Sequence, residues 1–371
     1  RHLPPANLAP EGHGKPLHGH KVCMTSAADR VTIVVTTSPI PSHPSPVLLR
    51  TLFASFKQHL TGVDGCDCIL VCDGYTRADG RPQLCAEEAY NGFLTTAQSL
   101  ASAGELGSCH LLRLDRCHGY GLALEAALRE VTTEFVLVVQ HDWLFVKDVD
   151  LSAAVSALDT DKEVKYIGMQ SLTTLEYARR MQVRYKIELP PARDVCGLHL
   201  VPQLLWYDKP HVCRADHYRK VVLPESKMGI LQNPERRYGV DLMWPHLRAS
   251  TELKKDHLMY GTFFWDVEAE VVYHLSGRKL LADEDTFSVE GELGKDQRPT
   301  DAAGQLRGEA STTATFTALA VERTMHVAGL ALPKKEAKGG RFKGRCYICG
   351  QKGHSKLNCE KRSELTAAPT E

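Results

Sequence analysis

The sequence predicts an α/β fold with a mostly parallel sheet, helices on both faces of that sheet and a small C-terminal module. Between residues 30 and 150, short apolar and β-branched segments alternate with segments whose apolar residues recur at helical spacing. This alternation favours parallel strands joined by right-handed crossovers. A chain of 371 residues, 43% of them hydrophobic, can bury a large core and carry a second, smaller unit.

The first strand is predicted at "RVTIVVTTSP", where a β-branched run suits burial on both faces. Ser45 and Pro46 then have the character of an N-cap and a first helical residue. The helix that they open carries one apolar stripe, which consists of Leu48, Leu52, Phe56 and Leu60. These segments predict the first strand and helix of the fold.

A second strand is predicted at "CDCILVCDGY", with its polar end at Asp73 and Gly74. A helix is expected over residues 85–103, and Gly104 stops it. The apolar positions of that helix are Tyr90, Phe93, Leu94, Ala97, Leu100 and Ala101. The second predicted strand therefore ends at a carboxylate, Asp73.

The third strand is predicted at "HLLRL", and Gly119-Tyr120-Gly121 opens the helix "LALEAALREV". The fourth strand, "EFVLVVQHDW", is apolar until it ends in polar residues that include Asp142. In open parallel sheets, ligands bind outside the carboxyl ends of the strands. Asp73 and Asp142 are therefore predicted to lie at the ligand-binding edge.

The remaining boundaries follow from composition. Residues 1–29 read as a disordered lead, 30–285 as the α/β domain, 286–340 as a linker with one possible helix, and 341–362 as the small module. Within the domain, "KYIGM" and "AEVVYHLSG" predict further strands, and residues 204–222 between them predict a loop and a helix.

The order of these segments, with "VVYHLSGR" near the end, resembles the GT-A nucleotide-sugar glycosyltransferases, particularly family 2. The resemblance implies that Asp73 contacts the nucleotide base and that Asp142 binds a divalent cation bridging the diphosphate. It also implies that His274 completes the cation site. Arg278, which lies near His274 in the sequence, is expected to contact phosphate. We therefore expect a nucleotide-sugar donor with Mn²⁺ or Mg²⁺.

The stretch Gln140-His141-Asp142 departs from the family's Asp-x-Asp motif, because the first carboxylate is missing. Gln140 can still bind a ribose hydroxyl, and Asp142 can still ligate the cation, since residues i and i+2 share a strand face. One carboxylate with one imidazole suits Mn²⁺ better than Mg²⁺. The alternative is a catalytically idle GT-A-like scaffold in a nucleic-acid-binding protein.

An inverting transferase also needs a carboxylate that deprotonates the acceptor hydroxyl. Glu235, in "NPERRYG", and Asp241 are candidates by position. Asp142 and Glu235 are therefore the predicted catalytic pair, one for the cation and one as the base.

The C-terminal module holds four possible metal ligands in the pattern C-x2-C-x4-H-x4-C. They are Cys346, Cys349, His354 and Cys359. Three thiolates and one imidazole form a closed tetrahedral zinc site, and a segment this short needs such an ion to fold. The pattern resembles the retroviral-type CCHC zinc knuckle, in which apolar residues stack on unpaired bases. Tyr347 and Leu357 stand in those places.

Charge supports a polyanionic partner for this module. Residues 334–362 hold ten basic and two acidic side chains, a net of +8, whereas the whole chain is neutral. Lys352 and Lys356 lie within the knuckle and are expected to contact phosphate. We therefore expect binding of single-stranded nucleic acid, RNA rather than DNA. A knuckle acquired from a mobile element is an open alternative.

The nine other cysteines are an odd number, scattered through hydrophobic stretches. They predict free, mostly buried thiols in a reducing compartment, either cytoplasm or nucleus. No apolar run is long enough to span a bilayer. The first residue is Arg1, so an N-terminal targeting segment can have been lost.

Overall fold

The computed structural model describes residues 27–275. The predicted linker, the predicted zinc knuckle and Arg278 lie outside the described residues, as does the lead up to residue 26. A short 3₁₀ turn, η1 (Ala27–Asp29), precedes the first strand, and Ala27 is buried in it. Regular structure therefore begins just before the predicted boundary at residue 30.

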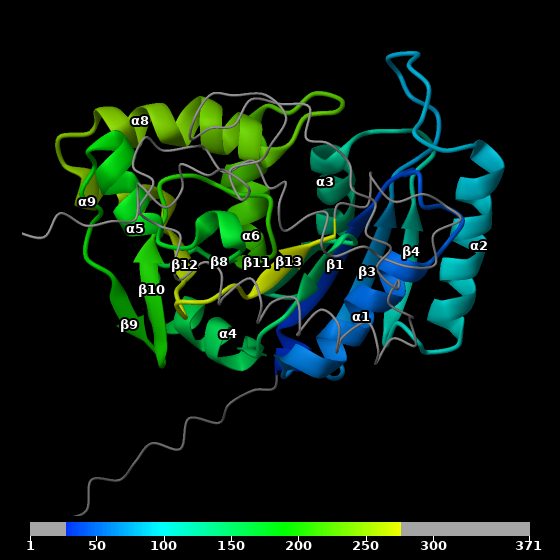
Figure 1. Ribbon diagram of the computed structural model, residues 1–371, viewed down its shortest axis with the longest axis horizontal. Coiled ribbons are helices and arrows are strands. Elements are labelled where there is room, and N and C mark those ends of the chain that lie inside the picture. The colour runs from blue at the N-terminus through cyan, green and yellow to red at the C-terminus, as the bar shows by residue number, and fades with distance from the viewer. Residues whose placement is uncertain (1–26, 276–371) are drawn as a thin grey trace, which may run out of the picture. The chain divides into compact units, whose positions relative to one another are not determined.

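A nine-stranded sheet forms the centre of the described chain, in the order β4-β3-β1-β5-β11-β8-β12-β10-β9 (Figure 1). Its strands are β1 (Val31–Thr37), β3 (Asp67–Cys72), β4 (Cys109–Arg113), β5 (Phe135–Gln140), β8 (Tyr166–Met169), β9 (Arg193–Val195), β10 (Leu198–Pro202), β11 (His211–Arg214) and β12 (Thr262–Trp265). Two further pairs lie outside it: β2 (Leu60–Thr61) with β7 (Val149–Asp150), and β6 (Trp143–Phe145) with β13 (Val272–His274).

The sheet is mainly parallel. β4, β3, β1 and β5 are parallel neighbours, and β8 and β12 are parallel to each other. β11 runs antiparallel to both β5 and β8, and β10 runs antiparallel to β12 and β9. The predicted parallel sheet is therefore confirmed in its first half, and two reversed strands make the second half mixed.

Helices cover both faces of the sheet. They are α1 (Val47–His59), α2 (Glu87–Ser102), α3 (Tyr120–Glu130), α4 (Leu151–Thr160), α5 (Tyr177–Arg180), α6 (Ala215–His217), α7 (Leu223–Ser226), α8 (Trp244–Ala249) and α9 (Leu253–Tyr260). Short 3₁₀ or π-helical segments complete the chain: η2 (Leu172–Thr174), η3 (Met181–Tyr185), η4 (Tyr218–Val222) and η5 (Glu235–Met243).

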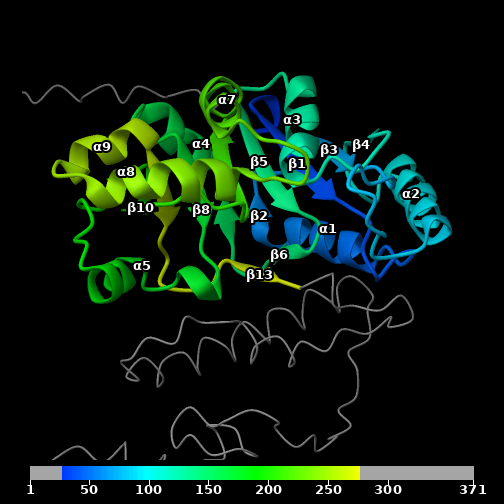
Figure 2. The ribbon, with the colours of Figure 1, turned by 90° about the horizontal axis from the view of Figure 1, so that it is seen from above.

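Strand residues alternate between two hydrophobic cores. Ile33, Val35 and Leu137 pack with α1, α2 and α4, whereas Val34 and Val138 pack with α3 and with the helical segments near α8. Figure 2 shows α1 on one side of β1 and β3 and α3 on the other. The predicted coverage of both faces is therefore confirmed.

Several predicted elements differ in extent or place. Pro46 is the N-cap of α1 rather than its first helical residue, although the predicted stripe of α1 is buried. The predicted strand "AEVVYHLSG" is confined to β13, which pairs with β6 outside the main sheet.

The prediction of a loop and a helix over residues 204–222 was wrong in part. His211–Arg214 is β11, a central strand that is hydrogen-bonded on both sides. The strand has only four residues, so its pattern is too short to distinguish it from the start of a helix.

Eight cysteines fall in the described residues, and all of them are free thiols. Five are buried: Cys66, Cys68, Cys72, Cys117 and Cys213. This agrees with the predicted thiols as far as the described residues reach.

Candidate functional site

Asp73 and Asp142 lie at the carboxyl edge of the parallel strands. The register pairs Thr37 of β1 with Cys72, and Thr36 of β1 with Gln140, so the two aspartates follow β3 and β5 at the same level. One strand separates β3 from β5. Neighbouring strands are about 4.8 Å apart, which places the two backbone positions about 10 Å from each other. That distance is within the span of a nucleoside diphosphate.

The Asp73 carboxylate accepts four hydrogen bonds from its own chain. Oδ1 accepts from the backbone N–H of His118 at 2.7 Å and of Gly74 at 3.0 Å. Oδ2 accepts from the backbone N–H of Gly119 at 2.8 Å and from the Cys117 thiol at 3.3 Å. Burial, and then the Asp73 charge, raise the pKa of Cys117, so this thiol remains a donor. Asp73 therefore fixes residues 117–119 in front of α3.

Gly119 and Gly121 allow another loop to approach the same segment. Gly119 has a φ of 82°, and a Cβ on it would lie 2.6 Å from the Cα of Leu231. A Cβ on Gly121 would meet the Met228 sulfur at 2.4 Å. The backbone N–H of Leu231 donates to His118 O at 2.9 Å. These glycines therefore serve backbone packing between α3 and the loop that leads to Glu235.

Asp142 and His274 lie side by side at the end of β5. Asp142 Oδ2 is 3.1 Å from His274 Nε2, and the Asp142 side chain is 13% exposed. Antiparallel pairing of β13 with β6 sets His274 opposite Trp143, the residue after Asp142. The N–H of Leu275 also donates to Asp142 O at 2.7 Å. Backbone pairing therefore holds this carboxylate and imidazole together.

The separation of this pair fits one divalent cation. Ligand atoms about 2.1 Å from an octahedral ion, at right angles, lie about 3 Å from each other, close to the observed 3.1 Å. Within residues 27–275, no group of three or more His, Cys, Asp or Glu side chains gathers around a metal position. An ion here would take its other ligands from water and from a bound diphosphate, as Mg²⁺ and Mn²⁺ commonly do.

Gln140, Asp208 and Glu235 form a linked set beside that pair. Gln140 Nε2 donates to the backbone oxygen of Asp208 at 3.1 Å. Asp208 N–H donates to Glu235 Oε2 at 3.0 Å, and Glu235 N–H donates to Asp208 Oδ1 at 3.1 Å. Through Asp208, these hydrogen bonds connect Glu235 to the end of β5, the region of the predicted cation site.

Asp208 and Glu235 are two neighbouring carboxyl groups in different surroundings. Asp208 is 6% exposed, and burial, followed by the nearby Glu235 charge, raises the pKa of Asp208 well above its usual range. Burial beside Glu235 therefore disfavours the charged form of Asp208. The other candidate base, Asp241, pairs with Arg236 at 3.1 Å and Arg237 at 2.9 Å. Two guanidinium groups thus engage the Asp241 carboxylate, whereas the Asp208 N–H connects Glu235 to the segment bonded to the end of β5.

Lys209 lies at the same edge, and it is not among the site residues predicted from the sequence. Its Nζ is 5.8 Å from the centre of the Trp143 ring, and the His274 ring is 4.7 Å from that same centre. Recognising β11 as an antiparallel strand would have identified Lys209, because such a strand starts at the edge where its neighbours β5 and β8 end. The sequence predicted a loop there, so Lys209 was not placed at this edge.

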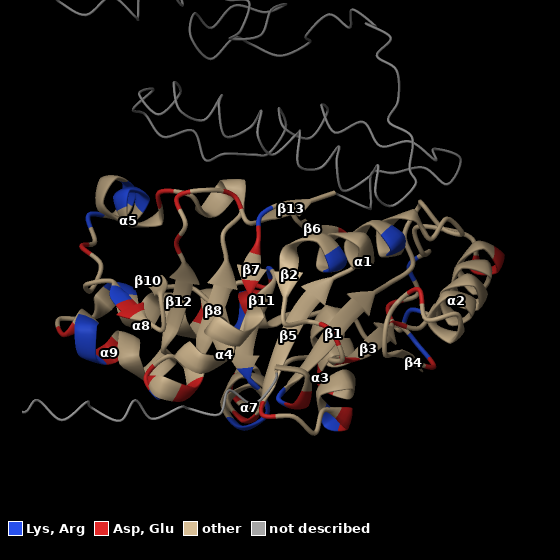
Figure 3. Cartoon of the chain, turned by 90° about the horizontal axis from the view of Figure 1, so that it is seen from below, with Lys and Arg blue, Asp and Glu red and all other residues tan. Residues whose placement is uncertain are grey.

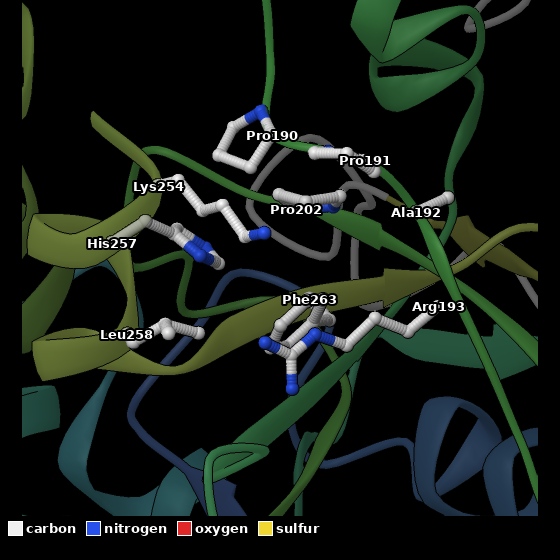
Figure 4. A pocket seen from close by; sticks show the side chains of 9 residues that line it. All are labelled: Pro190, Pro191, Ala192, Arg193, Pro202, Lys254, His257, Leu258 and Phe263. Atoms are coloured by element: carbon white, nitrogen blue, oxygen red, sulfur yellow. The ribbon is translucent and has the colours of Figure 1, made fainter. Parts of the chain in front are cut away.

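A cavity of about 190 Å³ lies elsewhere, among residues of β9, β10, β12 and α9 (Figure 4). Its lining includes Pro190, Pro202, Lys254, His257 and Phe263. None of the predicted site residues lines this cavity. Burial lowers the pKa of His257 to about 4, so its ring is neutral at physiological pH. This cavity therefore contributes nothing to the site at the end of β5.

Across the described residues, no helix combines the length and the apolar character that crossing a bilayer requires. No family profile matches the chain. No curated protein matches its sequence.

Some solved structures resemble parts of the chain. The mannosyltransferase PcManGT from Pyrobaculum calidifontis, in complex with GDP-Man and Mn²⁺, is 14% identical, with a TM-score of 0.36 over 52% of this chain and 46% of its own. TarS 1-349 from S. aureus, in complex with UDP-GlcNAc, is 14% identical, with a TM-score of 0.37 over 66% of this chain and 58% of its own. The chain thus spans less than two thirds of either protein. The strand order itself defines a mixed α/β protein with a large, mainly parallel sheet.

Proposed function

We propose that residues 30–285 form a GT-A-like transferase that binds a nucleotide sugar and transfers the sugar to an acceptor. The 3.1 Å approach of Asp142 Oδ2 to His274 Nε2, at the carboxyl edge of the sheet, is the observation that supports this best. Parallel α/β sheets bind ligands at that edge. A carboxylate and an imidazole at that separation provide two adjacent ligands for Mn²⁺ or Mg²⁺.

In this proposal a bound cation would supply positive charge against the diphosphate leaving group. Asp142 and His274 would hold this ion, and Arg278 would contact phosphate. Gln140 contacts the ribose from the end of β5, and Asp73 contacts the base with its own hydrogen bonds in place. Glu235 takes the proton from the acceptor hydroxyl, which gives transfer with inversion.

The test is binding of UDP and GDP to the full chain, with and without Mn²⁺. We expect Mn²⁺-enhanced binding of at least one nucleotide, and loss of that enhancement in Asp142→Ala. Asp148→Ala is the matched control, because Asp148 Oδ1 pairs with His59 Nδ1 at 2.9 Å away from this edge. No binding of either nucleotide would rule out the transferase. Unchanged binding in Asp142→Ala would rule out the cation site.

A catalytically idle scaffold is the second candidate, and specific contacts favour it. Four donors of the chain fill the Asp73 carboxylate, and the Gln140 amide is engaged with Asp208 O. These two side chains would otherwise be free for base and ribose. Nucleotide binding without sugar transfer or hydrolysis would identify this alternative.

We further propose that Cys346, Cys349, His354 and Cys359 bind one structural zinc ion. The folded knuckle would then hold single-stranded RNA through Tyr347, Leu357, Lys352 and Lys356. This rests on the ligand spacing and on the net charge of +8 over residues 334–362.

Metal analysis and binding of a single-stranded RNA oligonucleotide test the knuckle in the full chain. We expect one zinc ion per chain, and loss of both zinc and RNA binding in Cys349→Ser or with a chelator. Cys196→Ser removes an exposed thiol in the α/β domain and is the control. A protein without zinc would end this proposal, and tighter binding of DNA would correct the preference for RNA.

A further inference from the structure

The loop over residues 228–232 presents two apolar side chains to solvent. Ile230 is 48% exposed and Leu231 is 39% exposed. The two residues are neighbours in the sequence, so the tip of this loop is aliphatic. An isolated exposed apolar residue is ordinary, so the position and the conformation of this pair decide what the tip does.

Contacts place the loop beside the proposed active site. The Leu231 N–H donates to His118 O at 2.9 Å, and the His118 N–H donates in turn to the Asp73 carboxylate at 2.7 Å. In the other direction, the chain continues into η5, which begins at Glu235. Glu235 exchanges two hydrogen bonds with Asp208. The tip therefore lies next to the segment that Asp73 fixes, and it directly precedes the predicted catalytic base.

Leu231 is held in a conformation that leucine avoids. Its φ is 63°, in the left-handed region, which is unfavourable for a residue with a Cβ. The bond to His118 holds it, and so do the neighbouring bonds from Gly121 N–H to Gln232 O at 3.1 Å and from Gly229 N–H to Gln232 Oε1 at 2.8 Å. Residues kept in such conformations cluster at ligand sites. The fold therefore maintains a leucine where asparagine or glycine would fit the backbone better.

The loop rests on a fixed support. Figure 3 shows α7, which leads into the loop, beside α3. A Cβ on Gly119 would lie 2.6 Å from the Leu231 Cα, and a Cβ on Gly121 would lie 2.4 Å from the Met228 sulfur. Glycine at both positions thus allows the loop to pack closely on the start of α3. A surface that is already ordered binds its ligand without the cost of ordering it.

We propose that Ile230 and Leu231 bind an aliphatic group of the acceptor, so that the acceptor is an alcohol carrying an alkyl chain. This inference rests on the proposed function. The acceptor hydroxyl must reach Glu235, and the tip directly precedes the segment that Glu235 begins. Aliphatic side chains offer neither a ring to stack on a sugar nor a polar group to hydrogen-bond to one. They suit a saturated chain, which gains free energy by burying apolar surface.

The test measures binding of octyl glucoside and methyl glucoside to the full chain, with Mn²⁺ and either UDP or GDP. The two probes share one sugar, and the octyl probe is kept below its micelle concentration. We expect the octyl probe to bind more tightly. Leu231→Asn should weaken its binding about fourfold to fifteenfold, the effect of one or two buried methylene groups, and leave methyl glucoside binding unchanged. Ile230→Asn should act in the same way, and Leu231→Met should keep most of the affinity.

Leu231→Asn separates binding from folding, because asparagine tolerates the left-handed region better than leucine does. We expect its urea midpoint to be no lower than that of wild type, while its affinity for octyl glucoside falls. Lys186→Asn is the matched control. Lys186 also has a positive φ, 59°, and caps the end of η3. This control should relieve the same kind of strain and leave the binding of both probes unchanged.

Equal binding of the two probes to wild type would overturn this inference, while Mn²⁺-enhanced nucleotide binding would still uphold the proposed function. A lower urea midpoint of Leu231→Asn, with an equal loss for both probes, would also overturn it, because the tip would then have a structural role. Dimerisation that Leu231→Asn abolishes would assign the tip to a second copy of the chain instead. Absence of nucleotide binding by wild type would refute the proposed function, and this inference with it.

Discussion

Gln140 donates its side-chain amide to the backbone oxygen of Asp208 over 3.1 Å. The bond joins the end of β5 to the segment that leads into β11, and Asp208 in turn exchanges two hydrogen bonds with Glu235. A carboxylate at position 140 has no proton to donate and could not make this bond. Gln140 therefore lacks the first carboxylate of the Asp-x-Asp motif but provides the amide that connects β5 to Asp208.

Gln140→Asp should exchange stability for metal affinity. Without metal, we expect a loss of about 1 kcal/mol in the free energy of unfolding, because Asp208 O loses its donor. With Mn²⁺, the second carboxylate should raise the melting temperature by more than Mn²⁺ raises that of wild type. Gln83→Asp is the control, since the Gln83 amide donates to Tyr75 O beside the Asp73 loop and not to the end of β5. Equal Mn²⁺ shifts in wild type and Gln140→Asp would contradict the cation site.

Asp73→Asn tests the structural role of the four hydrogen bonds that the Asp73 carboxylate accepts. One oxygen becomes an amide that faces backbone N–H groups, so buried donors of residues 117–119 lose their acceptor. We expect the free energy of unfolding to fall by about 2–4 kcal/mol in urea titrations, because hydrogen bonds to a charged acceptor are lost. Asp67→Asn, which affects one exposed bond from Ser108 at 3.2 Å, should cost less than about 1 kcal/mol. A fully stable Asp73→Asn would show that these bonds do not hold the loop.

The first half of the fold could be predicted because β1, β3 and β5 are long and largely buried. All seven residues of β1 are buried, and the apolar stripe of α1 is visible in the sequence. In the second half, β8, β11 and β12 have four residues each. Runs of that length hold too few positions for either period to appear, so tertiary pairing decides their conformation.

The site could be predicted where a residue directly follows a strand. Asp142 follows β5 closely, and a parallel sheet places such residues at its binding edge. The position of Lys209 could not be predicted because it depends on the reversed direction of β11. The sequence did not reveal that direction, nor the donors that fill Asp73, because both arise from contacts between distant segments.

Alanine substitutions at Gly119 and Gly104 distinguish two contributions to the free energy of unfolding: backbone conformation and close packing. Both have positive φ, 82° and 73°, but a Cβ would meet Leu231 at 2.6 Å on Gly119 and nothing within 4 Å on Gly104. Gly104→Ala should therefore lose about 1 kcal/mol of unfolding free energy, from the left-handed conformation alone. Gly119→Ala should lose about 1–3 kcal/mol more, because the 228–232 loop must move. Equal losses in urea titrations would show that this loop yields freely.

His43 should make the folded protein sensitive to acid. Its side chain is buried, its ring stacks on Phe93 at 4.0 Å, and it lies 6.4 Å from the His141 ring. Burial first, and then His141, lower the pKa of His43 to about 2, whereas the unfolded chain titrates near 6.5. The unfolded state therefore binds a proton below pH 6.5 that the folded state refuses until about pH 2.

Stability from this group is complete above pH 6.5 and falls as the pH falls towards 2. The slope approaches about 1.4 kcal/mol per pH unit for one proton. His43→Phe keeps a stacking ring without a titrating nitrogen, although it loses the acceptor for Ile40 N–H. We expect the difference in unfolding free energy between wild type and variant to shift in favour of the variant from pH 6.5 to 4.5 in urea titrations. Burial also lowers the pKa of His211, His217 and His257, but these remain in both proteins, so their effect cancels in the difference. A difference that stays constant with pH would mean that His43 is protonated in the folded state, which its stacked and buried position opposes.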